Sequence, residues 1–136
     1  MHFNLVDRVI ELTPDSIVTH KCVSNAEEYL QDHFPGFPVL PGVLMLEAMV
    51  QAARRWYGSR FPEADRVVLG SVRALKYGTL VRPGCVIRVE VQSQSTSADS
   101  ISEFKGKVIV SETGAVAASG RFSLRPMKPC VSAALS

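Results

Sequence analysis

The sequence has no apolar run long enough to span a membrane. Its most apolar stretch covers residues 43–50 and is interrupted by Glu47, whereas a spanning helix needs about 20 consecutive apolar residues. Residues 1–9, MHFNLVDRV, also lack the basic segment followed by an apolar stretch that marks a secretory signal. We therefore expect a protein without a membrane partner.

Cysteine is scarce as well. The three cysteines, Cys22, Cys85 and Cys130, are an odd number and have no CxxC spacing. This pattern predicts neither a disulfide framework nor a metal site. The simplest interpretation is a reduced, cytoplasmic protein with no bound metal.

The length and composition suit one globular domain. The chain has 136 residues, of which 46% are hydrophobic and 21% charged, so it can bury a core and is not a disordered chain. We expect a single domain over residues 1–136, with residues 126–136 as a loose tail.

Positive charge is concentrated in the middle of the chain. Residues 1–53 contain two cations and seven acids, whereas residues 54–88 contain eight cations and two acids. The basic segment suits either a surface for an acidic partner or solvated strands and loops, and charge alone favours the second. It lacks a nucleic-acid-binding motif and interleaved aromatic residues, so we expect no nucleic-acid partner.

The spacing of apolar residues predicts six strands and one helix. Alternation is clearest at residues 87–92, where Ile87, Val89 and Val91 share one face. The helix should start at Pro41-Gly42, cover residues 43–57 and end at Gly58. Because it is apolar on nearly all sides, we expect an α+β fold in which an antiparallel β-sheet wraps around a long central α-helix. The strands are expected at residues 3–12, 17–23, 66–77, 86–95, 101–111 and 115–124.

Glu47 is unusual because it lies in the second turn of this apolar helix. Carboxylates are rarely buried without a partner or a function. Apolar surroundings favour the neutral form of a carboxyl group, which would let Glu47 hold a proton near neutral pH. The alternative is a carboxylate satisfied by backbone amides or an arginine, and the residue taken alone slightly favours this alternative.

Two further groups near the helix start are chemically suggestive. His33 lies on the expected loop before the helix and could act as a general base, although a lone loop histidine is more often incidental. Gly42 and Val43 would present unpaired N–H groups that suit a carbonyl oxygen gaining negative charge. Gly42 equally suits close packing.

The prolines between His33 and the helix bear on the number of chains in a site. Prolines recur every third residue at 35, 38 and 41, which favours a stiff polyproline-like path of up to about 25 Å from His33 to Pro41. On a straight path, His33 and Glu47 of one chain are too far apart to share a substrate. Either the loop folds back or a second copy completes the site, and we favour a dimer.

Residues 33–51, HFPGFPVLPGVLMLEAMVQ, resemble the HFPxxPxxPGVLxxEAxxQ signature of the β-hydroxyacyl-acyl-carrier-protein dehydratases of the FabZ type, which have the hot-dog fold. LVDRV at residues 5–9 and the pair Lys76-Tyr77 ahead of Pro83-Gly84 agree too, so the resemblance covers nearly the whole chain. The chain departs from the family pattern at Asp32, Leu80 and Cys85, where glycine, proline and aspartate are usual.

The resemblance implies a reaction and roles for matching residues. It implies dehydration of 3-hydroxyacyl thioesters on acyl carrier protein to trans-2-enoyl thioesters, without a cofactor, in fatty-acid or related lipid or polyketide synthesis. His33 would remove a proton from the substrate, and Glu47, supplied across a dimer interface, would protonate the leaving hydroxyl. Gly42 and Val43 would bind the thioester oxygen. Gln51 would be a supporting polar residue or, equally, only a hydrogen-bonding group of the helix.

The resemblance also implies partners and a substrate tunnel. The basic segment would face the acidic carrier protein, and the protein would be a homodimer or a hexamer. Two other interpretations are a hot-dog acyl thioesterase and a non-catalytic acyl-binding or scaffold subunit. The acyl chain would lie in an apolar tunnel shaped by Phe37, Val39, Met45 and Met49.

Overall fold

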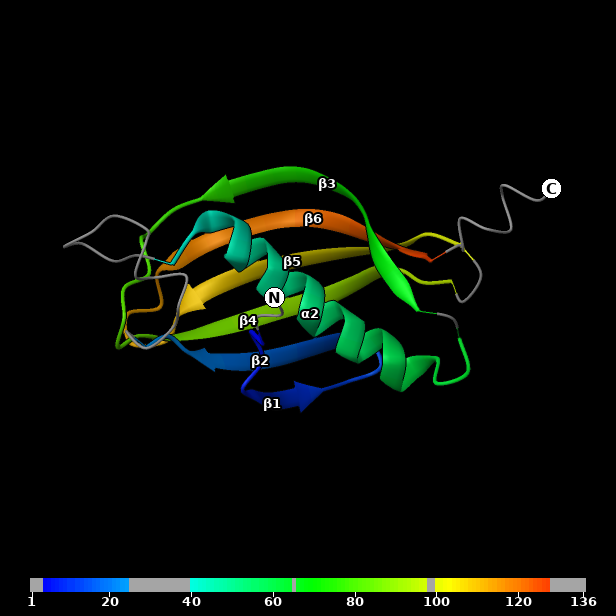
Figure 1. Ribbon diagram of the computed structural model, residues 1–136, viewed down its shortest axis with the longest axis horizontal. Helices are drawn as coiled ribbons and strands as arrows, with labels where there is room; N and C mark the ends of the chain where they lie inside the picture. The colour runs from blue at the N-terminus through cyan, green and yellow to red at the C-terminus, as the bar shows by residue number, and fades with distance from the viewer. Residues whose placement is uncertain (1–3, 25–39, 65, 98–99, 128–136) are drawn as a thin grey trace.

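The computed structural model describes residues 4–24, 40–64, 66–97 and 100–127. One helix, α2 (Gly42–Arg60), lies across one face of a six-stranded sheet (Figure 1). The strand order is β1-β2-β4-β5-β6-β3, and each neighbouring pair is antiparallel, which confirms the predicted architecture. The strands are β1 (Arg8–Leu12), β2 (Ser16–Cys22), β3 (Val67–Tyr77), β4 (Val86–Ser95), β5 (Ser102–Val110) and β6 (Val116–Pro126).

Five of the strands lie close to their predicted positions. Strand β4 matches its prediction of residues 86–95, and β2, β3, β5 and β6 have ends within two residues of theirs. In β4, Ile87, Val89 and Val91 are buried, whereas Gln92 is exposed. The period-two pattern therefore identified the face that packs on the helix.

The prediction of a strand over residues 3–12 is wrong in its first half. Strand β1 begins only at Arg8. Before it, Leu5 and Val6 are buried, and the Leu5 N–H donates to Gln51 on the helix. Leu5 belongs to the core and its N–H group is bonded to α2, so at this residue the chain contacts the helix and does not continue the strand.

The prediction that Gly58 ends the helix is also wrong, because α2 continues to Arg60. Tyr57, just before the glycine, is buried and its ring packs on Phe61 with centroids 4.9 Å apart. The Phe61 N–H donates to the Tyr57 carbonyl at 2.8 Å. Packing of the last turn outweighs the low helix propensity of one glycine, which is only about 1 kcal/mol.

The expected loose tail does not start at residue 126. Pro126 is the last residue of β6, opposite Val67. The Met127 N–H then donates to the Arg66 carbonyl at 2.7 Å. Residues 128–136 lie outside the described residues.

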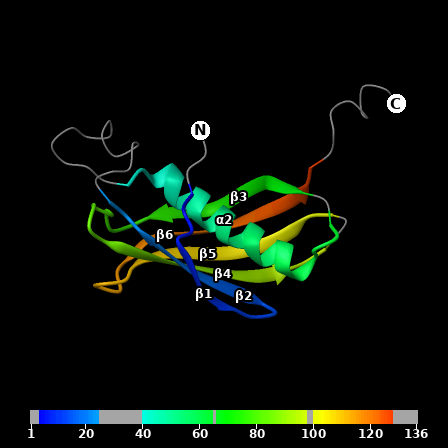
Figure 2. The same ribbon diagram turned by 60° about the horizontal axis from the view of Figure 1, so that its bottom comes forward.

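The core lies between α2 and the inner face of the sheet (Figure 2). Gly106 of β5 allows this close approach, because a Cβ atom there would lie 2.9 Å from Sδ of Met49. One end of the helix is more open, since Val43 is 67% exposed. In the described part of the chain, no helix has the length and apolar character needed to cross a membrane.

Candidate active site

The first turn of α2 presents backbone donors. Pro41 is the N-cap and offers no side-chain cap, and the first turn contains no acidic residue. The Pro41 carbonyl accepts from the N–H groups of Leu44 and Met45 at 3.0 and 3.4 Å. The N–H groups of Gly42 and Val43 find no acceptor among the residues that the structure describes. They therefore remain open to an oxygen carrying negative charge.

The helix start is held against the segment that follows β3. The Leu40 N–H donates to the Val81 carbonyl at 2.7 Å, and both residues are buried. This bond ties the residues just before the helix to the loop between β3 and β4. The backbone donors of the first turn therefore occupy a defined place beside the end of β3.

Tyr77, the last residue of β3, lies directly against the helix start. A Cβ atom at Gly42 would be 2.8 Å from Cε1 and Cζ of the Tyr77 ring. The absence of a side chain at Gly42 therefore makes room for the ring, which is itself 53% exposed. A β-bulge between Arg73 and Lys76, with Ala74 at φ 54°, precedes this end of the strand.

Glu47 is half-buried and bonded to a neighbour on its own helix. Its Oε1 accepts from Nε2 of Gln51 at 3.3 Å, a pairing that the i, i+4 spacing allows. Gln51 in turn accepts from the Leu5 N–H at 2.8 Å through Oε1. The carboxyl group therefore has a polar partner and remains partly open to solvent.

The structure brings together only part of the predicted site. Gly42, Val43, Glu47 and Gln51 lie on one helix, whereas His33, Phe37 and Val39 lie outside the described residues. Met45 and Met49 are buried in the core. Their part in a substrate tunnel remains a prediction.

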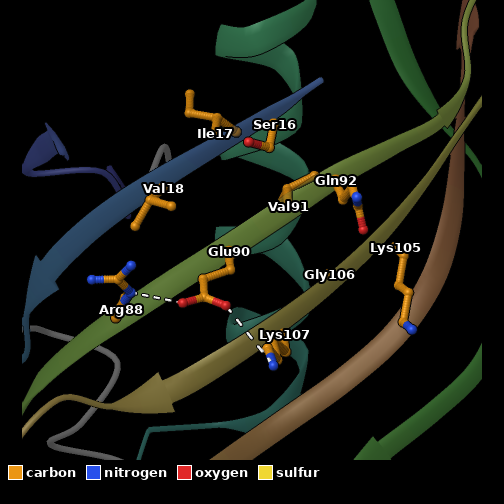
Figure 3. A pocket seen from close by; sticks show the side chains of 10 residues that line it. All are labelled: Ser16, Ile17, Val18, Arg88, Glu90, Val91, Gln92, Lys105, Gly106 and Lys107. Carbon is orange, nitrogen blue, oxygen red and sulfur yellow. Dashed lines mark hydrogen bonds and ion pairs between the residues drawn. The ribbon is translucent and has the colours of Figure 1, made fainter. Parts of the chain in front are cut away.

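A hollow of about 430 Å³ lies on the opposite, outer face of the sheet (Figure 3). It is lined by residues of β2, β4 and β5, and three of its charged residues form ion pairs. Glu90 accepts from Arg88 at 2.7 Å and lies 3.9 Å from Lys107. The sheet separates this hollow from α2, so we do not assign the candidate chemistry to it.

The predicted basic segment does not form a single surface. Arg54, Arg55 and Arg60 are on α2. Arg73 and Arg88 instead lie on the outer face of the sheet, where they pair with Glu103 and Glu90. The concentration of cations along the sequence is therefore divided between two sides of the fold.

Sequence reasoning missed two contacts. The first is the hydrogen bond from the Leu5 N–H to Gln51, two residues that are 46 positions apart in the sequence. The second is the packing of Tyr77 on Gly42. The only signals were an apolar segment before β1 and a glycine next to the helix start, and neither identifies its partner.

Comparisons with known proteins first give the class. The structure resembles a chain of the dehydratase heterocomplex ApeI:P from Xenorhabdus doucetiae, with a TM-score of 0.75 and 20% identity, over 97% of this chain and 88% of that one. This likeness shows the fold, a hot-dog fold.

Sequence comparisons then give the family. A model of the FabA-like domain matches residues 1–119. The 3-hydroxyacyl-[acyl-carrier-protein] dehydratase FabZ of Caulobacter sp. strain K31 is 40% identical over 89% of this chain and 75% of its own length. The FabZ of Ruminiclostridium cellulolyticum is 36% identical over 93% and 88%. The chain belongs to the FabA-like domain family, among relatives of the FabZ type.

Proposed function

We propose that the protein removes water from 3-hydroxyacyl thioesters carried on acyl carrier protein, giving trans-2-enoyl thioesters for fatty-acid or related lipid synthesis. The observation that carries this proposal is the half-buried Glu47, placed on α2 beyond two open N–H groups, in a chain similar to FabZ dehydratases. A carboxylic acid and a pair of amide donors suit an elimination next to a thioester carbonyl.

In the proposed mechanism, His33 takes the proton from the carbon next to the thioester carbonyl. Negative charge builds on the carbonyl oxygen, which accepts from the N–H groups of Gly42 and Val43. The electron pair then forms the new double bond as the bond from carbon to the 3-hydroxyl breaks. Glu47 gives its proton to the departing hydroxyl, which leaves as water. The reaction changes no oxidation state, so the scheme includes no cofactor.

Geometry along the helix supports Glu47 as the acid. Glu47 is five residues beyond Gly42, a rise of about 7.5 Å. Side chains of an α-helix tilt toward its N-terminus, which allows Glu47 to share a substrate with the helix start while its Oε1 accepts from Gln51.

The proposal is tested by following both possible products of a 3-hydroxyacyl carrier-protein thioester. We expect the absorbance of a conjugated enoyl thioester to appear while a thiol reagent detects no free thiol. Release of thiol would identify a thioesterase instead. Tight binding of the carrier without any turnover would identify a non-catalytic subunit.

We further propose that the working unit is a homodimer joined at β3. On one side β3 pairs with β6, and its other edge has no strand neighbour among the described residues. This strand has eleven residues and ends at Tyr77, against the helix start. A second copy added at this edge would bring its own residues near Gly42, which agrees with a site that needs His33 and Glu47 from two chains.

A charge on this edge should separate the two copies. Val72 of β3 is 36% exposed, and Val72→Glu would place like charges where the copies meet, which costs several kcal/mol in an interface. We expect the dissociation constant to rise about 100-fold or more. Sedimentation over a range of concentrations measures it and also reads any assembly of dimers into a hexamer.

Val9→Glu is the matched control for this substitution. Val9 is 37% exposed and lies on β1, at the opposite edge of the sheet. The control should sediment as the wild type does. A monomeric wild type, or equal behaviour of the two variants, would contradict the proposed interface.

The acyl carrier protein is the proposed substrate carrier, and a cytoplasmic location agrees with the free thiols of Cys22 and Cys85. Because the basic segment is divided between two sides of the fold, we propose that only part of it contacts the carrier. Lys76 is exposed and next to Tyr77, so it is the cation on β3 nearest in sequence to the helix contact. It is the first residue to test for carrier binding.

A side chain at Gly42 should disturb the proposed thioester site. In Gly42→Ala the new methyl group would displace the Tyr77 ring, and a small misplacement in an active site can cost up to about 100-fold in rate. We expect kcat/KM to fall about 10- to 100-fold. Because the ring is half-exposed and can move, the free energy of unfolding should fall by only about 1 kcal/mol.

Gly58→Ala provides the control for a helix glycine. A Cβ atom at Gly58 would meet nothing within 4 Å. This variant should keep the wild-type kcat/KM and gain about 0.5–1 kcal/mol of stability from higher helix propensity. Undiminished kcat/KM in Gly42→Ala would remove Gly42 from the proposed site.

A further inference from the structure

We propose that Gln51 is a positioning residue that determines which oxygen of Glu47 delivers the proton. Its amide group is oriented by the Leu5 N–H and holds Oε1 of Glu47, which leaves Oε2 as the oxygen that protonates the substrate. The inference deepens the proposed function, because it rests on Glu47 acting as the acid.

The first step is the orientation of the Gln51 amide. The Leu5 N–H can only donate, so the atom 2.8 Å from it must be the amide oxygen. Leu5 is fully buried, and a buried N–H without an acceptor is unfavourable. Rotation of the amide by half a turn would place its NH2 group against this N–H. The orientation is therefore determined by the chemistry of the pair.

The second step is the effect on Glu47. With its oxygen on Leu5, the Gln51 amide presents Nε2 to Oε1 of Glu47 at 3.3 Å. An amide N–H donates, so Oε1 must offer a lone pair and cannot carry a proton toward Gln51. The proton of the neutral carboxyl group is therefore on Oε2. One oxygen is held and the other is left for the reaction.

The third step concerns the charge that develops. When Oε2 gives its proton to the leaving hydroxyl, the O–H bond breaks and Glu47 becomes a carboxylate. A hydrogen bond from Gln51 to the charged form is stronger than one to the neutral acid. Gln51 therefore stabilises the transition state more than the ground state, and its removal should lower kcat more than it raises KM.

Hydrogen bonds to β2 hold the segment before β1 in place, so the Leu5 N–H has a fixed position. The Asp7 carboxylate accepts from the Cys22 N–H at 2.8 Å and from Nζ of Lys21 at 3.3 Å. The Asp7 N–H donates to the His20 carbonyl at 2.9 Å. Strand β2 thus holds the residues next to Leu5, and Leu5 holds Gln51.

The main test is Gln51→Leu, assayed with a 3-hydroxyacyl carrier-protein thioester. We expect kcat to fall about 10- to 100-fold, the range of one hydrogen bond to a charged group, with KM changed less than about threefold. Gln92→Leu is the matched control, since Gln92 is exposed on the outer face of the sheet. It should leave both constants unchanged.

A double-mutant cycle separates positioning from a merely structural role. If Gln51 acts through Glu47, adding Gln51→Leu to Glu47→Gln should cost less than about twofold more. A second variant, Gln51→Glu, keeps an acceptor for the Leu5 N–H and so guards against misfolding. In its ionised form this side chain offers Glu47 no donor, so its kcat should also fall about tenfold or more.

The outcomes distinguish this inference from the function on which it rests. An inactive wild type would overturn the proposed function and the inference together. An active wild type with normal kcat in the folded Gln51 variants would overturn the inference alone. The same holds if Gln51→Leu costs as much in the Glu47→Gln background as in the wild type.

Discussion

Glu47→Gln should lower kcat by about 100- to 10,000-fold, the usual contribution of a general acid. The substitution keeps the size of the side chain and its place beside Gln51, but an amide has no acidic proton to give to the leaving hydroxyl. Because Glu47 is half-buried and not part of the core, the fold should be unaffected. Steady-state turnover of a 3-hydroxyacyl carrier-protein thioester measures the loss.

Glu63→Gln is the control for this experiment, because Glu63 is exposed beyond the end of α2. It should turn over substrate at the wild-type rate. Circular dichroism should show the same folded spectrum for both variants. A Glu47→Gln protein with wild-type turnover would exclude Glu47 as the acid, whatever the fold and the family.

Phe104→Ala should reduce the free energy of unfolding by about 3–5 kcal/mol, as expected for a large buried aromatic residue. The Phe104 ring lies edge-on to Trp56 of α2 and stacks on Phe122 of β6, with both centroid distances at 5.6 Å. It is 1% exposed. Its loss leaves a cavity where the helix meets the centre of the sheet, and urea unfolding at fixed protein concentration measures the cost.

Ile101→Ala is the comparison for this core substitution. Ile101 is 57% exposed and immediately precedes β5. Its replacement should change the free energy of unfolding by no more than about 0.5 kcal/mol. If Phe104→Ala lowered the free energy of unfolding no more than Ile101→Ala does, the packing of the helix would not depend on this aromatic cluster.

The sheet was predictable because its inner face is strongly apolar. Alternation in β4 separates Ile87, Val89 and Val91 from polar neighbours, and such a pattern has only one register that buries it. The helix was predictable for a related reason, since a helix with apolar residues on many sides must be buried by other elements of the fold. Helix ends were less predictable, because the buried Tyr57 and its contact with Phe61 override Gly58.

The site could be predicted only where its members are close in the sequence. Glu47 and Gln51 are four residues apart on one helix, so their contact follows from helical geometry. Leu5 and Tyr77 reach the same helix from distant segments. No local pattern encodes such contacts, because they depend on how β3 and the segment before β1 approach α2. The roles of His33, Phe37 and Val39 remain predictions from the resemblance.

The most direct test of the proposed function is the mass of the carrier protein after reaction. A series of 3-hydroxyacyl carrier-protein thioesters of increasing chain length is incubated with the wild type and analysed by mass spectrometry. We expect at least one member to lose the mass of one water while its thioester stays intact, and Glu47→Gln to abolish this change. Unchanged masses across the whole series, or carriers released as free thiols, would contradict dehydration as the function of this protein.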